Sequence, residues 1–506
     1  MQKLSQHQRR EEKRLNNCFT RYIRKAAVLV CLFLLPSIAM ADGTDPLWKF
    51  DELTEKAYER ALNLDFAAVH QLIPSPTTTQ HHYVVSLAEA LELLLNEDAE
   101  KFSVFEERFN NRLERKTKLN SPEDLFLQAE IRTQWAFVYL KFGHEFDAAL
   151  NLRQAYLTVE AIKERFPHFQ PVNKTSGLLN VVIGSVPQKY NWVLSLLSIQ
   201  GSTAKGLEEL SRVNGIFAFE SKVIHALILG FLQQQPSDGM EKIHQVLAEH
   251  PTNRLALFLG SALARKSRLS DEALSMLDSL DNQSEDVTLH LAQYLRGELY
   301  LYKGQYLQAI ASYRWFIGNY RGQNGLKDAY YKIGLCYWLN GNPNDAHATF
   351  KIARTIGKDA SEADKYAARS LAEAELPHVM LTRARYATDG GYYERARIIL
   401  DSIQASVIPT DRDQAEYFYR KARLAHYTKE IHSAKKLYLK SIQITGDHPW
   451  YFAPNSCLQL GYIALEEGAE SAAKNYFNRA LTYNKHEYKN SIDSKARSAL
   501  GQIKRK

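Results

Sequence analysis

Several short clusters carry side chains that could do chemistry, but each lacks a partner that the chemistry needs. His144-Glu145 has no second histidine at zinc-hydrolase spacing, and Gly201–Gly206 lacks the Lys-Ser/Thr ending of a phosphate loop. His81-His82 follows a Thr-rich loop and favours a solvated pair over a metal site. Glu106-Glu107 and Glu466-Glu467 are typical of solvated helix faces rather than a glycosidase pair. We therefore predict no catalytic residue, no metal and no cofactor.

Residues suited to recognition are more plentiful, because tyrosine, tryptophan and arginine carry much of the binding energy at protein interfaces. If the repeats described next form a solenoid, one row of side chains faces its concave groove. The predicted groove residues are Tyr294, Glu298, Tyr302, Asp328, Tyr331, Trp338, Arg385, Glu416, Tyr419, Arg423, Tyr427, Asn455 and Tyr462. Tyr419 and Arg423 lie four residues apart and could act together on a peptide carboxylate. The alternative is that several of these tyrosines pack between neighbouring repeats.

The groove would be built by a repeated pattern of small and aromatic residues at fixed spacing. It occurs at 297–316, 334–353, 384–403, 422–441 and 461–480, and once in the N-terminal half at 136–155. In each, an alanine or glycine lies where two helices would cross, and a large residue fills the gap beside it. This spacing is that of the tetratricopeptide repeat. It predicts an all-α solenoid, a right-handed superhelix of antiparallel helix pairs that must stack to bury their apolar faces.

Turn residues and linkers place the helix boundaries. Gly304, Gly341, Gly391 and Gly468 fall where the first helix of a pair should end. The longest step between repeats contains residues 360–376, which predict an extra helix ending before Pro377. We divide the chain into a signal peptide (1–41), an irregular helical-repeat region (42–285) and a regular array with a capping helix (286–506).

A family resemblance rests on three motifs. The first runs from Gly177 through Ser185 and Pro187 to Gly201 and Gly206-Leu207; the others are Asp389–Tyr393 (Asp-Gly-Gly-Tyr-Tyr) and Ser491–Ala496. These resemble segments of the inclusion-body-clearance / tetratricopeptide-repeat-thirty-nine family and its uncharacterised bacterial relatives, over most of residues 50–505. The resemblance implies an all-helical repeat fold and a non-enzymatic adaptor role. The eukaryotic members are cytosolic and linked to lipid and inclusion-body handling, whereas this chain carries an export signal, so that cellular role is not carried over.

The net charge of +7 is concentrated at the N-terminus. Residues 1–41 hold eight Lys/Arg and two acids, so the remaining chain is nearly neutral and predicts no nucleic-acid partner. Basic residues precede an apolar run, Ala26–Leu35, and small residues at 39 and 41 precede Asp42, which is the layout of a secretory signal. We expect export to a bacterial periplasm after cleavage following Ala41. An uncleaved inner-membrane anchor is the alternative, and then this segment would be the only contact with the membrane.

Only Cys336 and Cys457 lie outside that signal, and two buried core residues are favoured over one long-range disulfide. Taken together, these features predict a non-catalytic exported scaffold that binds a protein or peptide segment in a concave groove. A glycan- or lipid-binding repeat protein of the cell envelope is the second hypothesis. An enzyme with a site assembled from distant residues is the third.

Overall fold

The computed structural model describes residues 48–114, 121–186, 197–282, 289–359, 361–373 and 375–503. Every regular element within these ranges is a helix, which confirms the predicted all-α class. The predicted signal peptide lies outside the described residues, as do residues 187–196 of the first family motif.

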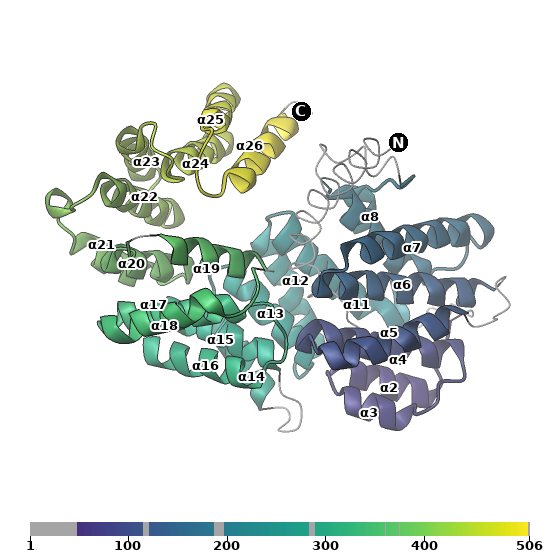
Figure 1. Cartoon of the computed structure of the whole chain (residues 1–506). Coiled ribbons are helices and arrows are strands. Elements are labelled where there is room, and N and C mark those ends of the chain that lie inside the picture. The colour runs from purple at the N-terminus through teal and green to yellow at the C-terminus, as the bar shows by residue number, and fades with distance from the viewer. Residues whose placement is uncertain are drawn as a thin grey trace, which may run out of the picture. The chain divides into compact units, whose positions relative to one another are not determined.

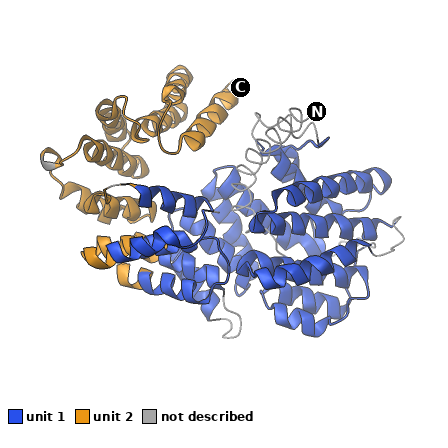
Figure 2. Ribbon diagram, in the orientation of Figure 1, with its two compact units in different colours: residues 1–297, 310–333, 347–372 blue, residues 298–309, 334–346, 373–506 orange. Residues whose placement is uncertain are grey.

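The chain folds as two compact units, coloured separately in Figure 2. Unit 1 comprises residues 1–297, 310–333 and 347–372, and unit 2 comprises residues 298–309, 334–346 and 373–506. This division does not coincide with the boundary that we drew after residue 285, which remains a prediction from sequence.

The helices of unit 1 are mostly antiparallel pairs, labelled in Figure 1. They are α2 (Glu52–Leu62), α3 (Phe66–Leu72), α4 (Thr79–Asn96), α5 (Ala99–Glu114), α6 (Pro122–Phe142), α7 (Glu145–Arg165), α8 (Val172–Gly184), α10 (Thr203–Ser211), η2 (Gly215–Phe217), α11 (Ala218–Leu227), the π-helical η3 (Ile228–Leu232), α12 (Pro236–Glu249), α13 (Arg254–Lys266), α14 (Ser270–Asp281) and α19 (Glu362–Ala372). The extra helix predicted between 360 and 376 is thus present as α19.

Four helices contribute residues to both units, and the rest of unit 2 is a regular series of pairs. The shared helices are α15 (His290–Lys303), α16 (Tyr306–Asn319), α17 (Leu326–Leu339) and α18 (Pro343–Thr355). Unit 2 continues with α20 (Val379–Asp389), α21 (Tyr393–Asp401), η4 (Ala405–Val407), α22 (Asp411–Tyr427), α23 (Ile431–Thr445), α24 (Phe452–Glu466), α25 (Glu470–Thr482) and α26 (Lys489–Ile503).

The turns between paired helices use the left-handed backbone region, as the glycine positions predicted. Gly304, Gly341, Gly391 and Gly468 have φ between 73° and 87°. In the fourth repeat Lys429 takes the equivalent place with φ 64°, although a residue with a Cβ is strained there. The repeat therefore keeps its turn geometry even where its glycine is missing.

Small residues at the helix crossings are buried, as the repeat spacing predicted. Ala309, Ala346, Ala396, Ala434 and Ala473 are each 0% exposed. A Cβ built on Gly461 would lie 2.5 Å from the ring of Phe477 on the second helix of the same pair. The aromatic residue thus fills the space that the glycine leaves, so the helices can approach closely.

Helices α8 and α10 approach even more closely, through glycines of the first family motif. A Cβ on Gly206 would lie 2.5 Å from the carbonyl oxygen of Gly177, and one on Gly201 would lie 2.5 Å from the backbone nitrogen of Gly184. The hydroxyl of Ser202 accepts a hydrogen bond from the backbone N–H of Lys205 and caps α10. The sequence from Gly201 to Gly206 is therefore a helix-packing and capping element.

The two cysteines among the described residues, Cys336 on α17 and Cys457 on α24, are buried free thiols. This confirms the prediction of two small buried core residues.

Candidate functional site: the first-helix face of unit 2

The predicted groove residues fall into two groups by exposure. Glu298, Asp328, Tyr331 and Tyr419 are buried, so they offer a partner little surface. The half-buried residues are Tyr294, Tyr302, Trp338, Arg385, Glu416, Arg423, Tyr427, Asn455 and Tyr462. The alternative of tyrosines packed between repeats thus describes Tyr331 and Tyr419.

Two of the predicted residues of unit 1, Tyr294 and Asp328, bond to each other. The Tyr294 hydroxyl donates to the carboxylate of Asp328, and the ammonium group of Lys332 lies 2.7 Å from the same carboxylate. Asp364 on α19 accepts from the backbone N–H of Asp328 at 3.1 Å. Tyr331 packs against the ring of Phe350. This set links α15, α17 and α19.

The predicted pair of Tyr419 and Arg423 does not form the exposed carboxylate-binding couple that its spacing suggested. The Tyr419 hydroxyl accepts a 2.8 Å hydrogen bond from the amide of Asn455 on α24. Arg423 lies with its guanidinium 4.5 Å from the ring centroid of Tyr427 on its own helix. Tyr419 faces the neighbouring repeat, where packing removes it from solvent.

Aromatic stacking aligns two other predicted residues. Tyr302 stacks on Tyr386 with ring centroids 5.8 Å apart, and Tyr427 stacks on Tyr393 at 6.0 Å. The indole N–H of Trp338 donates to the carbonyl of Pro377 at 2.9 Å, and the ring of Tyr462 meets that of Phe477 edge-on. These contacts fix the side chains in place while leaving part of each exposed.

A group of charged side chains surrounds Glu416 on α22. Arg420, one turn later, donates to one carboxylate oxygen from Nε at 2.9 Å and from Nη2 at 2.6 Å. The same Nη2 donates to the hydroxyl of Tyr451 at 2.8 Å. Arg385 on α20 and Arg412 at the start of α22 complete the group. We call Arg385, Arg412, Glu416, Arg420 and Tyr451 the arginine patch.

The electrostatics of the arginine patch keep Glu416 ionised. Burial alone would raise the pKa of Glu416, but Arg420, and beyond it Arg385 and Arg412, hold that pKa below its usual value. Burial likewise acts to lower the pKa of Arg420, yet Tyr451 and Glu416 bring it above the ordinary value. Burial raises the pKa of the Tyr451 hydroxyl. The patch is therefore a set of fixed charges that are paired with one another.

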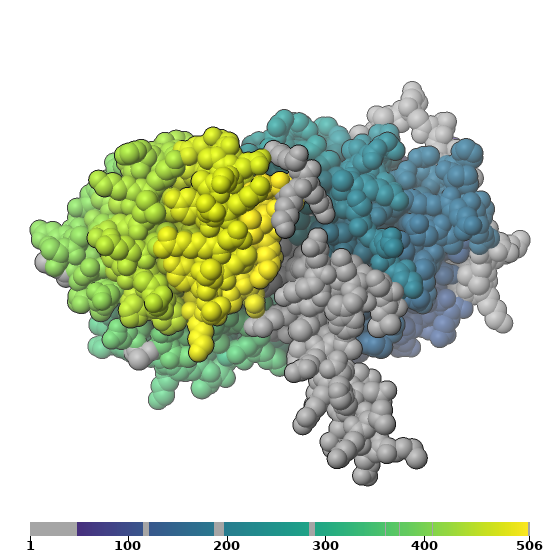
Figure 3. Space-filling model, turned by 90° about the horizontal axis from the view of Figure 1, so that it is seen from above, coloured from purple at the N-terminus to yellow at the C-terminus, as the bar shows by residue number. Residues whose placement is uncertain are grey.

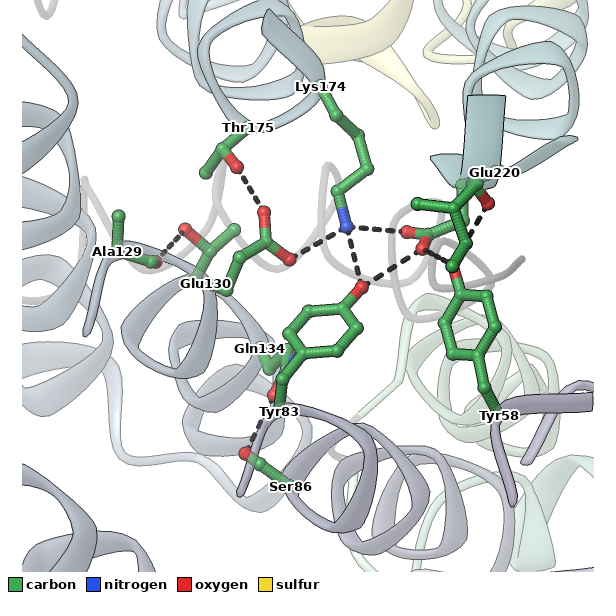
Figure 4. Close-up of polar contacts among 11 residues, drawn as sticks. Tyr58, Tyr83, Ser86, Ala129, Glu130, Gln134, Lys174, Thr175 and Glu220 are labelled. Carbon is green, nitrogen blue, oxygen red and sulfur yellow. Dashed lines mark hydrogen bonds and ion pairs between the residues drawn. The ribbon is translucent and has the colours of Figure 1, made fainter. Parts of the chain in front are cut away.

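A second polar cluster lies in the interior of unit 1, and sequence reasoning missed it (Figure 4). The ammonium group of Lys174 on α8 lies 2.8 Å from the carboxylate of Glu130 on α6 and 2.7 Å from that of Glu220 on α11. Tyr83 on α4 accepts a hydrogen bond from Lys174 at 2.9 Å. The hydroxyl of Tyr58 on α2 donates to Glu220 at 2.7 Å.

These five residues come from the first helices of five successive pairs, the row that would line a groove in an open solenoid. In this protein other side chains bury the row. Trp48 inserts its indole among them, with its ring centroid 4.9 Å from that of Phe126 and 5.9 Å from that of Tyr83. Phe217 closes the group, and the Lys174 ammonium group lies 4.5 Å from its ring centroid.

Burial and ion pairing act in opposite directions on the pKa values of this cluster. Burial acts to lower the pKa of Lys174, but Glu130 and Glu220 hold it above its ordinary value. Burial raises the pKa of Glu220, and Lys174 offsets this only in part. Every member has a hydrogen-bond partner within the cluster, which is the arrangement of a structural core.

Glu220 lies within a long apolar segment, and its ion pair indicates where that segment belongs. Residues Gly215–Leu232 have a mean hydropathy of 1.6, long and apolar enough to cross a membrane, but 67% of the segment is buried inside the protein. Its acidic residue is paired with Lys174, so the segment has the character of a core helix.

No metal-ligating group of three or more His, Cys, Asp or Glu side chains occurs among the described residues.

No curated protein matches the chain in sequence. The tetratricopeptide repeat model matches residues 454–487, which contain most of α24 and all of α25. The fold is a tetratricopeptide-type helical-repeat solenoid. The resemblance to the inclusion-body-clearance family remains a prediction.

Solved structures with similar helical arrangements include a monomeric mutant of IFIT1 with Gppp-AAAA, at 14% identity and a TM-score of 0.32, covering 83% of this chain and 94% of that one. The human IFIT1 dimer with PPP-AAAA has 14% identity and a TM-score of 0.29, covering 86% and 96%. The APC/C hetero-tetramer Cut9-Hcn1 has 10% identity and a TM-score of 0.30, covering 88% and 96%. Such low scores support no inference about a binding site or a partner.

Proposed function

We propose that this tetratricopeptide-type protein is a non-catalytic scaffold that holds a protein or peptide segment against the first helices of unit 2. The observation that carries this proposal is the arginine patch, where side chains from α20, from α22 and from the start of α24 meet. Charged, oriented groups beside half-exposed tyrosines are typical of interface hot spots.

The row of first-helix residues around Lys174 in unit 1, which we call the inner row, supports this placement by contrast. Its aromatic and ionic side chains are buried against one another, so that surface is already filled by the chain itself. In unit 2, Arg385, Tyr427 and Tyr462 keep part of their surface exposed. The space-filling view shows the C-terminal helices as a surface of packed side chains, in which the gaps between the ribbons are filled (Figure 3). A partner would therefore lie on the face rather than pass between helices.

Site-specific photo-crosslinking in the native cell tests this proposal. A photoreactive residue at Tyr427 or Tyr462 reports the first-helix face. The same residue at Ile398 or Leu439, which are exposed on the second helices α21 and α23, is the matched control. We expect defined protein adducts from positions 427 and 462 only. Adducts that form equally well at 398 and 439 would contradict binding on this face.

We also propose that the scaffold is exported. The basic, apolar and small-residue order of residues 1–41 supports this, and cleavage would leave Asp42 as the first residue. Mass spectrometry of the intact protein, purified from separated cell compartments, measures the mature N-terminus. A protein that retains residues 1–41 in the inner membrane would indicate the anchored alternative, and a full-length soluble cytoplasmic protein would refute export.

A further inference from the structure

Residues 48–50 form a short non-helical segment that lies on the inner row before α2 begins. Trp48 is buried, Lys49 is exposed and Phe50 is half-buried, so alternate side chains face the row, as in an extended chain. The Phe50 ring meets that of Tyr58 edge-on with centroids 4.8 Å apart, and lies 6.3 Å from that of Tyr83. The segment therefore contacts the row through two aromatic side chains that are two residues apart.

No hydrogen bond to the described residues holds this segment in place. Neither its backbone nor its side chains make one, and the buried indole N–H of Trp48 has no partner. Helix α2 does not depend on the segment, because Asp51 caps it and accepts a 2.8 Å hydrogen bond from the backbone N–H of Thr54. The segment can therefore leave the row while α2 keeps its first turn.

The polar cluster beneath is complete without the segment. The hydroxyls of Tyr58 and Tyr83 donate to Glu220 at 2.7 and 3.0 Å, and Lys174 pairs with the same carboxylate. What the segment covers is aromatic: the rings of Tyr83 and Phe217, whose centroids lie 5.2 and 4.5 Å from the Lys174 ammonium group. Such rings accept another aromatic ring edge-on. Departure of the segment would expose them and break no hydrogen bond of the cluster.

We propose that the inner row is a second peptide-binding surface, which residues 48–50 occupy as an internal competitor. Its ligand is an extended segment of a partner protein with aromatic side chains two residues apart, the pattern of Trp48 and Phe50. This inference goes beyond the proposed function, because it concerns unit 1 and does not depend on a partner at unit 2.

The competitor sets a threshold for binding. Residues 48–50 are joined directly to α2, so their effective concentration at the row is on the order of millimolar. A partner at lower concentration must bind correspondingly more tightly to displace them. The segment therefore keeps weak ligands away from the row.

The test uses the full chain and a fluorescein-labelled peptide with the sequence of residues 46–51, Pro-Leu-Trp-Lys-Phe-Asp. The comparison peptide carries Ala for Trp and Phe. Trp48→Ala/Phe50→Ala vacates the surface, and Lys49→Ala, at the exposed residue between them, is the matched control. Fluorescence anisotropy should show the aromatic peptide binding about tenfold more tightly to the double variant than to the wild type or Lys49→Ala, because the competitor is absent. The same peptide should raise the melting temperature of the double variant, as a ligand of the native state does.

A second measurement covers the case in which the double variant does not fold. A fluorophore carried by an unnatural amino acid at position 49 of the otherwise unchanged chain reports the freedom of the segment. The aromatic peptide at about 1 mM should displace the segment and lower the anisotropy of this fluorophore. The Ala peptide should leave it unchanged.

Three results would overturn the inference. They are equal binding of the aromatic peptide to the double variant and the wild type, equal binding of the two peptides, and no binding to a folded double variant. If the double variant is unfolded, an anisotropy at position 49 that neither peptide changes decides against it. Crosslinks from positions 427 and 462 report unit 2 alone, so none of these results bears on the scaffold proposal.

Discussion

The carboxylate of Glu97, at the end of α4, accepts a 2.6 Å hydrogen bond from the hydroxyl of Tyr320, which lies 223 residues later at the end of α16. The backbone N–H of Gln323 donates to the same carboxylate at 3.0 Å, and the Lys141 ammonium group lies 3.2 Å away. Glu97 holds a left-handed conformation with φ 51° to make these contacts. One acidic residue therefore joins the early helices of unit 1 to the loop after α16.

This contact makes part of the stability of unit 1 depend on pH. Burial acts to raise the pKa of Glu97, but Lys141, Tyr320 and the backbone N–H of Gln323 hold it below its ordinary value. A carboxyl group with a lowered pKa stabilises the fold above its unfolded pKa, near 4.5, and this stabilisation is lost as the pH falls through the folded pKa.

We expect Glu97→Gln to destabilise unit 1 by about 3 kcal/mol at neutral pH and to flatten the loss of stability below pH 4.5. Hydrogen exchange of α4 and α16, measured from neutral to acidic pH, checks both effects. Glu100→Gln, an exposed residue on α5, is the control. An acid dependence as steep as that of the wild type would contradict the role of Glu97.

The buried Lys174 cluster gives a second prediction. Lys174→Met removes the cation between Glu130 and Glu220 and leaves both carboxylates buried without it, which costs about 3–5 kcal/mol. Lys222→Met on α11 removes a lysine of a part-exposed pair with Glu249 and should cost at most about 1 kcal/mol. Hydrogen-exchange protection of α6, α8 and α11 measures both. Similar effects of the two substitutions would show that the cluster does not secure the fold.

Close backbone packing between α8 and α10 gives a third prediction. Gly206→Ala places a methyl group 2.5 Å from the Gly177 carbonyl oxygen, so the helices must separate at a cost of about 1–3 kcal/mol. Gly318→Ala on α16 meets no atom within 4 Å and should be neutral or stabilise by about 0.5–1 kcal/mol, because alanine favours helix. Thermal unfolding compares the two proteins. A harmless Gly206→Ala would refute the packing role of the first family motif.

Trp48 gives a fourth prediction, because its indole fills the interior of the inner row. Trp48→Ala leaves a cavity beside Tyr83 and Phe126 and should destabilise the surrounding helices by about 3–5 kcal/mol. Trp315→Ala, at a residue 38% exposed on α16, should cost far less. Hydrogen exchange in α4 and α6 reports the difference. Unchanged protection in Trp48→Ala would mean that the indole is dispensable.

The regular repeats could be predicted from sequence because their geometry depends on neighbours in the chain. The spacing from Gly461 to Phe477 specifies a crossing within a single helix pair, and the structure confirms it. The turn glycines are equally local. The exposure of each groove residue could not be predicted, because it depends on the adjacent repeat: Tyr419 is buried since Asn455, from the next first helix, reaches its hydroxyl.

The Lys174 cluster escaped sequence reasoning for a related reason. Its members are separated by up to 162 residues, as in the contact between Tyr58 and Glu220, and no periodic spacing connects them. One clue was available: Lys174 and Glu220 each lie in or beside an apolar stretch, where a charged residue needs a partner. Without a fold, that clue does not say which partner.

The contacts that bury the inner row of unit 1 have a consequence for biosynthesis. Repeat arrays usually gain structure one repeat at a time, because each contacts only its neighbours. Here Tyr58 cannot meet Glu220 until 162 further residues have been made, a delay of roughly 8 to 32 s at ordinary elongation rates. Until then the hydroxyls of Tyr58 and Tyr83 lack the carboxylate to which both donate. The early helices therefore complete their packing late, whereas the later pairs, such as α24 and α25, can form as soon as they emerge.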